Sequence, residues 1–250
     1  MHVFRVASLL TLTALLLACG REPSAAELTA KGIANLQSAK TAHLDGSAQI
    51  ALKGQNGVSS SFDLKLVGDA QLPDKARMTV QVALGGMTFS IDTIVIDGKE
   101  FTNDGVSGKW SDGAGSSPIN SLMDPLGNID ESLIRNVVEV DRPEVDGRKT
   151  RHLRYQVDSA KMLGQLRKSA GASAQSIANP QGTGELWIRI DDSQIVRQLV
   201  KVTMDVDGLA NFLPASASNV GKSAAELSLD MQFSKHGEAV PAITAPPVAR

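Results

Sequence analysis

The chain of 250 residues contains a single cysteine, Cys19. It therefore cannot form an internal disulfide or a multi-thiolate metal site, and its stability must come from burial of apolar side chains. Phe, Trp and Tyr together make up only 4% of the residues, so a large sheet has few bulky side chains to fill its interior. Charge of one sign is also lacking, because 25 Lys and Arg face 27 Asp and Glu. Nucleic acid and acidic lipid headgroups are therefore not expected partners.

The common catalytic motifs are missing as well. The sequence has no His-Glu-x-x-His, Gly-x-Ser-x-Gly or Cys-x-x-Cys. His43, His152 and His236 show no pairing along the chain, and Asp191-Asp192 and Asp205-Val206-Asp207 lack the spacing of a calcium loop. We expect no catalytic residue, no metal and no cofactor, and a protein that is not an enzyme.

An apolar run from Val6 to Ala18 follows a weakly basic start. It is too short to span a bilayer as a mature helix and has the form of a signal peptide. It ends in Leu16-Leu17-Ala18-Cys19, and a small residue directly before cysteine is the pattern of a bacterial lipobox. This pattern predicts cleavage before Cys19 and acylation of its sulfur and new amine. An ordinary secretory signal with an incidental cysteine is the alternative interpretation.

These features divide the chain into four expected parts. Residues 1–18 are a lipoprotein signal peptide, 19–24 a short tether, 25–236 a single domain and 237–250 a flexible tail rich in Pro and Ala. The acylated Cys19 would hold the domain at the extracytoplasmic face of the cell membrane, so the membrane itself is an expected partner.

Helical spacing of apolar residues is confined to short segments. Ser24 and Glu27 have the spacing of a capping box and predict a helix over residues 25–39. Asp158 or Ser159 caps a second helix through about Ser169. Residues 122–134 suggest a broken helical segment, and residues 170–183 and the insertion 207–223 are expected to be loops.

Elsewhere the apolar residues alternate with polar ones, which is typical of antiparallel strands with one buried face. Gly85-Gly86 and Asp146-Gly147 are two of the hairpin signals between them. About eleven strands are expected, the longer ones spanning roughly 33 Å, and so wide a sheet curls under its own twist. The predicted fold is α+β: a strongly curved antiparallel half-barrel with helices packed on its concave face.

The concave face is expected to carry mostly aliphatic side chains and methionine. They either fill the core themselves or leave a trough that a lipid fills, and methionine adapts readily to variable apolar partners. The candidate ligand-binding residues are Ile50, Phe62, Leu64, Leu66, Met78, Val80, Val82, Met87, Phe89, Ile91, Phe101, Leu126, Met162, Leu166, Leu186, Ile188, Val200, Val202, Met204, Leu229 and Met231.

Several short motifs resemble one known family. They are His43-Leu44-Asp45-Gly46, Asp97-Gly98-Lys99-x-Phe101, Gly108-Lys109-Trp110, Asp124-Pro125-Leu126, Gly184-Glu185-Leu186-Trp187-Ile188 and Ile195-Val196-Arg197. Together with the lipobox they resemble the LppX, LprA, LprF and LprG lipoproteins of actinobacterial envelopes. That family shares a half-barrel wrapped round helices with the carriers LolA and LolB. The resemblance implies an apolar cavity that takes the acyl chains of diacyl or triacyl glycolipids, and transfer of such lipids through the envelope.

The functional expectation is therefore a membrane-anchored lipoprotein that binds a diacyl or triacyl (glyco)lipid, with an envelope lipid transporter as a further candidate partner. A buried methylene is worth about 0.8 kcal/mol, so a two-chain lipid does not cross water without a carrier. The alternative hypothesis is a sensor or scaffold lipoprotein whose core is fully packed and which acts through contacts with other proteins.

Overall fold

The computed structural model describes residues 21–54, 59–72, 74–84, 87–97, 99–103, 105, 107–112, 131–170, 177–206 and 223–247. Four features expected from the sequence lie outside these residues: the signal peptide with Cys19, the Gly85-Gly86 turn, Leu126, and residues 207–222 of the insertion. No helix in the described ranges is long and apolar enough to cross a membrane.

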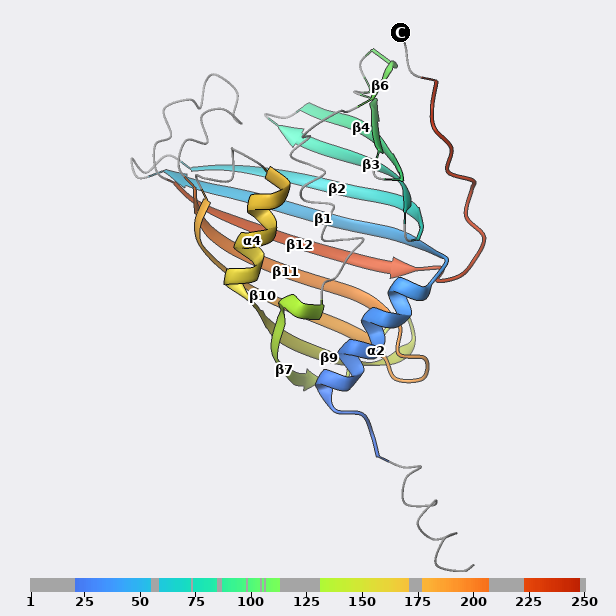
Figure 1. The fold of residues 1–250 in the computed structure, drawn as a ribbon, viewed down its shortest axis with the longest axis vertical. Coiled ribbons are helices and arrows are strands. Elements are labelled where there is room, and N and C mark those ends of the chain that lie inside the picture. Colours follow the sequence, from blue (N-terminus) through green and yellow to red (C-terminus); the bar gives the residue numbers. More distant parts are fainter. Residues whose placement is uncertain are drawn as a thin grey trace, which may run out of the picture.

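Twelve strands form one antiparallel sheet (Figure 1), in the order β6-β5-β4-β3-β2-β1-β12-β11-β10-β9-β7, with β8 beside β9. The strands are β1 (Thr41–Gly54), β2 (Ser59–Gln71), β3 (Lys75–Leu84), β4 (Met87–Ile96), β5 (Lys99–Asn103), β6 (Trp110–Asp112), β7 (Ile134–Asp141), β8 (Glu144–Val145), β9 (Arg148–Val157), β10 (Ile177–Arg189), β11 (Ile195–Val206) and β12 (Ser223–Ser234).

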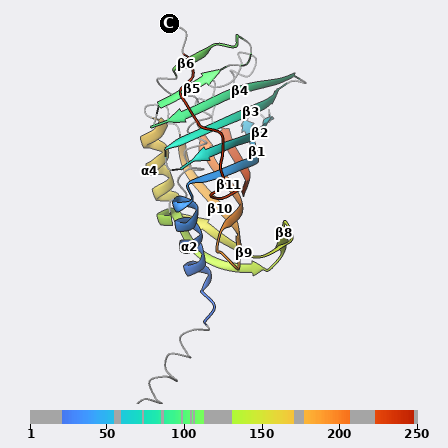
Figure 2. The same cartoon turned by 90° about the vertical axis from the view of Figure 1, so that its right-hand side faces the viewer.

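The prediction of a curved α+β half-barrel is confirmed. The sheet curls without closing, since β6 and β7 are its end strands and no strand among the described residues joins them. Two α-helices, α2 (Ala25–Ser38) and α4 (Ser159–Ala170), lie on the same side of the sheet (Figure 2). We call the face that they cover the concave face and the opposite one the convex face.

Helix α2 begins as its sequence predicts. The Ser24 hydroxyl accepts a hydrogen bond from the Glu27 amide, and the Glu27 carboxylate accepts one from the Ser24 amide. The helix packs closely on the sheet at Gly32, where a β-carbon would lie 3.1 Å from atoms of Ile188 and Ile195. A small residue here lets the helix backbone approach the end of the β10–β11 hairpin.

Two boundaries differ from the sequence expectation. Residues 131–133 form a short 3-10 helix, and β7 starts directly after it at Ile134. Strand β10 starts at Ile177, inside the segment expected to be a loop, because Ile177 and Ala178 pair with Val206 and Asp205 of β11. Backbone pairing with a neighbouring strand therefore outweighs the small, polar composition of this stretch.

The hairpin signal at Asp146-Gly147 is confirmed in detail. Val145 pairs with Arg148, and the two residues between them have positive φ angles of 51° and 72°. Positive φ at both central positions defines a type I′ turn, whose twist matches that of the flanking strands.

The chain beyond β12 contacts the sheet as far as Ile243. The Gly237 amide donates to the Thr41 carbonyl, the Thr41 hydroxyl donates to the Glu238 carbonyl, and the Ile243 side chain is 5% exposed. Pro241 and Ile243 bound a small hollow of about 290 Å³ against convex residues of β1 to β3.

Glycines provide the space for large side chains on the concave face. Gly184 pairs with Tyr155 and Gly46 pairs with Met231. A β-carbon at either glycine would overlap its partner, the Tyr155 ring or the Met231 sulfur. Pairing a large residue with a glycine lets the two side-chain layers of a tightly curved sheet interdigitate.

We predict that Gly184→Val destabilises the fold, because the buried Tyr155 ring has no room to move aside. Overpacking of this kind costs about 1–3 kcal/mol of unfolding free energy. The matched control is Gly164→Ala in the exposed part of α4, where an added β-carbon meets nothing within 4 Å; there we expect a gain of about 0.5–1 kcal/mol. Urea denaturation measures the free energy of unfolding of both variants. Equal effects would contradict the close packing of Tyr155 over Gly184.

Candidate functional site

Strand register assigns the concave face residue by residue. Cross-strand partners point to the same face of a sheet. Gly46 pairs with Leu66 and Met231, and Leu66 pairs with Val80, which pairs with Ile91. The same face continues from Met231 to Gln198 in β11. A largely apolar surface, interrupted in β11 by the polar Gln198, thus runs across the sheet.

One half of this surface, beside α2, is solidly packed. Val80, Leu186, Ile188 and Met231 are fully buried. They belong to one apolar cluster that also contains residues of α2. Of the candidate ligand-binding residues, Leu64, Leu66, Met78, Val80, Leu186, Ile188, Leu229 and Met231 are all in this cluster. This half is core, as the first of the two sequence interpretations held.

The other half of the concave face is more open. Phe89, in β4 and paired with Val82, is 38% exposed, which is unusual for a large apolar side chain on the inner face of a sheet. Candidate residues that are likewise only partly buried are Ile50, Phe62, Val82, Ile91, Val200 and Met204. We call these six residues, together with Phe89, the open half.

The open half is continuous in register. Ile50 pairs with Phe62, and Val82 pairs with Phe89. Ile50 and Phe62, with Met204, also pack on a second small cluster of Leu52, Val206 and Ala225. Val202, between Val200 and Met204, is buried, as is Met162 of α4. The structure therefore brings together candidates from both halves of the chain, on β1 to β4 and on β11.

Phe101 is placed on the opposite face. It pairs with Ile94, which pairs with Arg77, and both belong to the convex side. The two-residue β4–β5 turn sets this register, since Ile96 pairs with Lys99. Met87 and Leu166 lie in β4 and α4, but their side chains, like Leu126 and Cys19, are outside what the structure describes.

Sequence reasoning missed a polar pair in the floor of the concave face. The Gln198 side-chain amide donates to the Tyr155 hydroxyl over 3.3 Å, and both side chains are buried. Burial raises the pKa of Tyr155, and the hydrogen bond from Gln198 lowers it by less. The Gln198 Oε1 has no partner. The Gln198 Oε1 is thus an unpaired hydrogen-bond acceptor among the aliphatic side chains of the concave face. No sequence motif indicates it.

A second polar group, Glu100, lies in β5 opposite Val95. Burial raises the pKa of its carboxyl, and its Oε1 is buried without a hydrogen-bond partner. A carboxyl with a raised pKa can be neutral closer to physiological pH than an ordinary one. It stands at the β4–β5 end of the concave face, away from the packed half.

The polar chemistry of the chain is concentrated on the convex face. The His152 ring stacks on Trp187 with centroids 4.2 Å apart, and its two nitrogens lie 3.0 Å from Asp141 and 2.9 Å from Glu185. Arg197 covers Trp187 and forms a bidentate pair with Asp230. These side chains supply one another's hydrogen-bond and ion-pair partners, which is typical of a network with a structural role. Within the described ranges, no three His, Cys, Asp or Glu side chains are grouped to hold a metal.

Comparison with solved structures finds similar folds. The lipoprotein LppX from Mycobacterium tuberculosis superimposes with a TM-score of 0.46 at 15% identity, over 88% of this chain and 99% of its own. LprF from Mycobacterium bovis gives 0.49 at 14% identity, over 90% and 99%. A LolA superfamily protein from Nitrosomonas europaea gives 0.32 at 7% identity, over 84% and 93%. The chain resembles the LppX and LprF lipoproteins.

That resemblance is the one that the sequence motifs indicated. At identities this low the likeness is limited to the arrangement of strands and helices, and it does not identify a ligand. No protein-family model and no curated protein matches the chain. The functional argument therefore depends on the geometry of the concave face itself.

The two halves of that face make a testable contrast on a single strand. Val80 and Val82 lie on β3 and point to the same side, but Val80 is fully buried and Val82 is not. Val80→Trp should lower the unfolding free energy by about 1–3 kcal/mol or more, because the packed half has no room. Val82→Trp should cost less, because Val82 packs at the margin of the same apolar cluster and is only partly buried. Urea denaturation measures the loss of unfolding free energy in each variant. Equal losses would mean that the open half is packed as densely as the rest of the concave face.

Proposed function

We propose that this protein is an acylated lipoprotein outside the cytoplasm that binds the acyl chains of a diacyl or triacyl (glyco)lipid against the open half of its concave face. It holds them there while the lipid moves through the envelope, to or from a lipid transporter. Cys19 carries the anchor. One observation is central: the inner face of an unclosed sheet leaves Phe89 and its aliphatic neighbours partly exposed.

Dimensions and energetics support this proposal. The strands that cross the concave face have 10 to 14 residues, so each spans roughly 33–46 Å, enough for an extended acyl chain. Each methylene moved from water to this surface contributes about 0.8 kcal/mol. Aliphatic side chains and methionine suit acyl chains of varied shape because they make contact without fixed directions.

The free polar groups point to how a lipid could be oriented. Glu100 and the unpaired acceptor of Gln198 are the buried groups on this face without hydrogen-bond partners in the described chain. A hydroxyl of a glycerol or sugar headgroup would satisfy Glu100, which is only partly buried. Leaving such groups unpaired costs about 1–3 kcal/mol each, so a ligand that pairs them gains binding energy.

The test uses residues 20–250, produced in bacteria without the anchor and examined by native mass spectrometry before and after organic extraction. We expect a lipid adduct of acyl-chain composition that extraction removes and reconstitution restores. Ligand-free protein from lipid-rich cells, with no uptake on reconstitution, would contradict lipid binding and favour the scaffold hypothesis.

A matched pair of variants ties the adduct to the concave face. Phe89→Glu places a charge in the open half, whereas Thr88→Glu places the same charge on the exposed convex side of the same strand. We expect Phe89→Glu to reduce lipid loading several-fold and Thr88→Glu to leave it unchanged. Thermal melting checks that both fold, and equal loading of the two variants would place the ligand elsewhere.

A further inference from the structure

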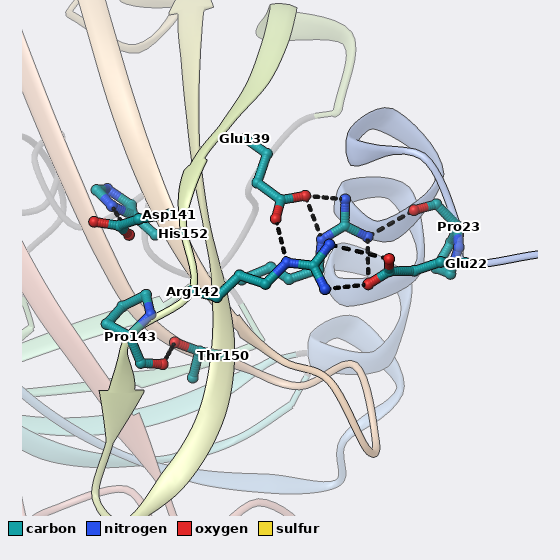
Figure 3. A network of polar contacts seen from close by, with 9 residues as sticks. Glu22, Pro23, Glu139, Asp141, Arg142, Pro143, Thr150 and His152 are labelled. Carbon is teal, nitrogen blue, oxygen red and sulfur yellow. Dashed lines mark hydrogen bonds and ion pairs between the residues drawn. The ribbon is translucent and has the colours of Figure 1, made fainter.

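The segment that follows Cys19 is fastened to the edge of the sheet. Arg151 of β9 is 5% exposed and donates to the Pro23 carbonyl over 2.6 Å and to the Glu139 carboxylate over 2.8 Å (Figure 3). Arg142 joins the same group, lying 2.6 Å from Glu139 and 2.8 Å from Glu22. We call these five residues the tether clamp.

The clamp leaves little free chain between the sheet and the anchor. Glu22 is three residues after Cys19, and three residues of extended chain reach at most about 11 Å. The acyl groups on Cys19 must therefore lie close to the β7 edge of the sheet. In Figure 1 residues 21–24, which precede α2, lie below β7 and the start of α2.

The edge at this point exposes apolar side chains. Val138 is 54% exposed and Val140 is 41% exposed, and both lie on β7, the last strand of the sheet. They belong to a set of four exposed large apolar residues in the described chain, with Ile190 and Phe89. Nothing in the domain's own packing requires two neighbouring valines to face solvent here.

The strand is poorly suited to pair with another strand. Its register with β9 is broken between Arg135 and Val138 and again between Glu139 and Asp141, and Asn136 has a positive φ of 52°. Bulges of this kind twist an edge away from further pairing. The exposed valines are thus better placed against a bilayer than against a second sheet.

We propose that the β7 edge docks on the membrane that holds Cys19, with Val138 and Val140 in the interfacial layer and the tether clamp setting the orientation of the sheet. This inference depends on the acylation of Cys19 in the proposed function. Two valines bury too little apolar surface to hold an unanchored protein, but the anchor makes their contact effectively intramolecular. The strands would then stack outward from the bilayer, as they do upward in Figure 1.

The test labels the full-length lipoprotein with an environment-sensitive fluorophore. Because Cys19 is the only native cysteine and would be acylated, an introduced cysteine is the sole free thiol. Val138→Cys and Val140→Cys report on the β7 edge, and Lys109→Cys, exposed beside β6, reports on the opposite edge. The proteins are placed in phosphatidylcholine vesicles with and without doxyl-labelled lipid. We expect several-fold stronger quenching at positions 138 and 140 than at 109.

A second comparison tests the clamp. Arg142→Gln removes one of the two arginines that join Glu22 to Glu139 and leaves Arg151 in place. Arg154→Gln removes an exposed arginine of β9 that pairs with Glu185, away from the tether. Quenching at position 140 should fall toward the level at 109 in Arg142→Gln and should persist in Arg154→Gln. Both variants should melt close to the parent, because exposed ion pairs contribute little to stability.

The outcomes separate this inference from the function on which it rests. A chain that floats with the vesicles but shows equal quenching at 138, 140 and 109 would overturn the docking edge and leave the anchor intact. A chain that does not float would overturn both. Quenching that survives Arg142→Gln would show that the orientation does not depend on the Arg142 ion pairs.

Discussion

The structure depends on how one curled sheet covers its own concave face. A closed barrel would bury that face completely, but this sheet ends at β6 and β7, and two helices in the described chain must do the covering. They reach part of it. Where α2 approaches, glycines opposite large side chains allow dense packing, as at Gly184 with Tyr155 and Gly32 with Ile188. Beyond that reach, Phe89 and its neighbours stay partly exposed.

This division gives the two ends of the molecule different properties. The packed half holds the fold together and carries the tether clamp at its edge, where the buried Arg151 joins Pro23 to Glu139. The open half lies on β1 to β4 and β11, and it shares β1 to β3 with the packed half, as Val80 and Val82 of β3 show. A lipid bound there would be held mainly by apolar contact, with the carboxyl of Glu100 as a free polar partner. The geometry thus separates the part that fixes the domain from the part that would carry cargo.

Much of the fold was predictable because the alternation of apolar and polar residues along a strand shows which face of the sheet each side chain occupies. Met78, Val80 and Val82 were expected on one face of β3, and the register confirms it. The capping box at Ser24 and the Asp146-Gly147 turn were also readable, since each depends on contacts within a few residues.

The failures share a physical cause, which is dependence on distant partners. In β4 the apolar residues shift from one face to the other between Ile91 and Ile94, so alternation could not place Phe101 beyond the next turn. The start of β10 depends on pairing with β11, a strand that follows it in the sequence. Likewise, the arrangement of Arg151 around Pro23 joins residues 128 positions apart.

The most direct test of this account is photo-crosslinking with a lipid that carries a diazirine in its acyl chain. The protein is loaded, irradiated and digested, and the labelled residues are mapped by mass spectrometry. We predict labels on the concave residues of β3, β4 and β11, at Val82, Phe89 and Met204, and none on the convex neighbours Gln81 and Thr88. Labels spread equally over both faces, or confined to the convex face, would contradict the claim that the open half holds the acyl chains.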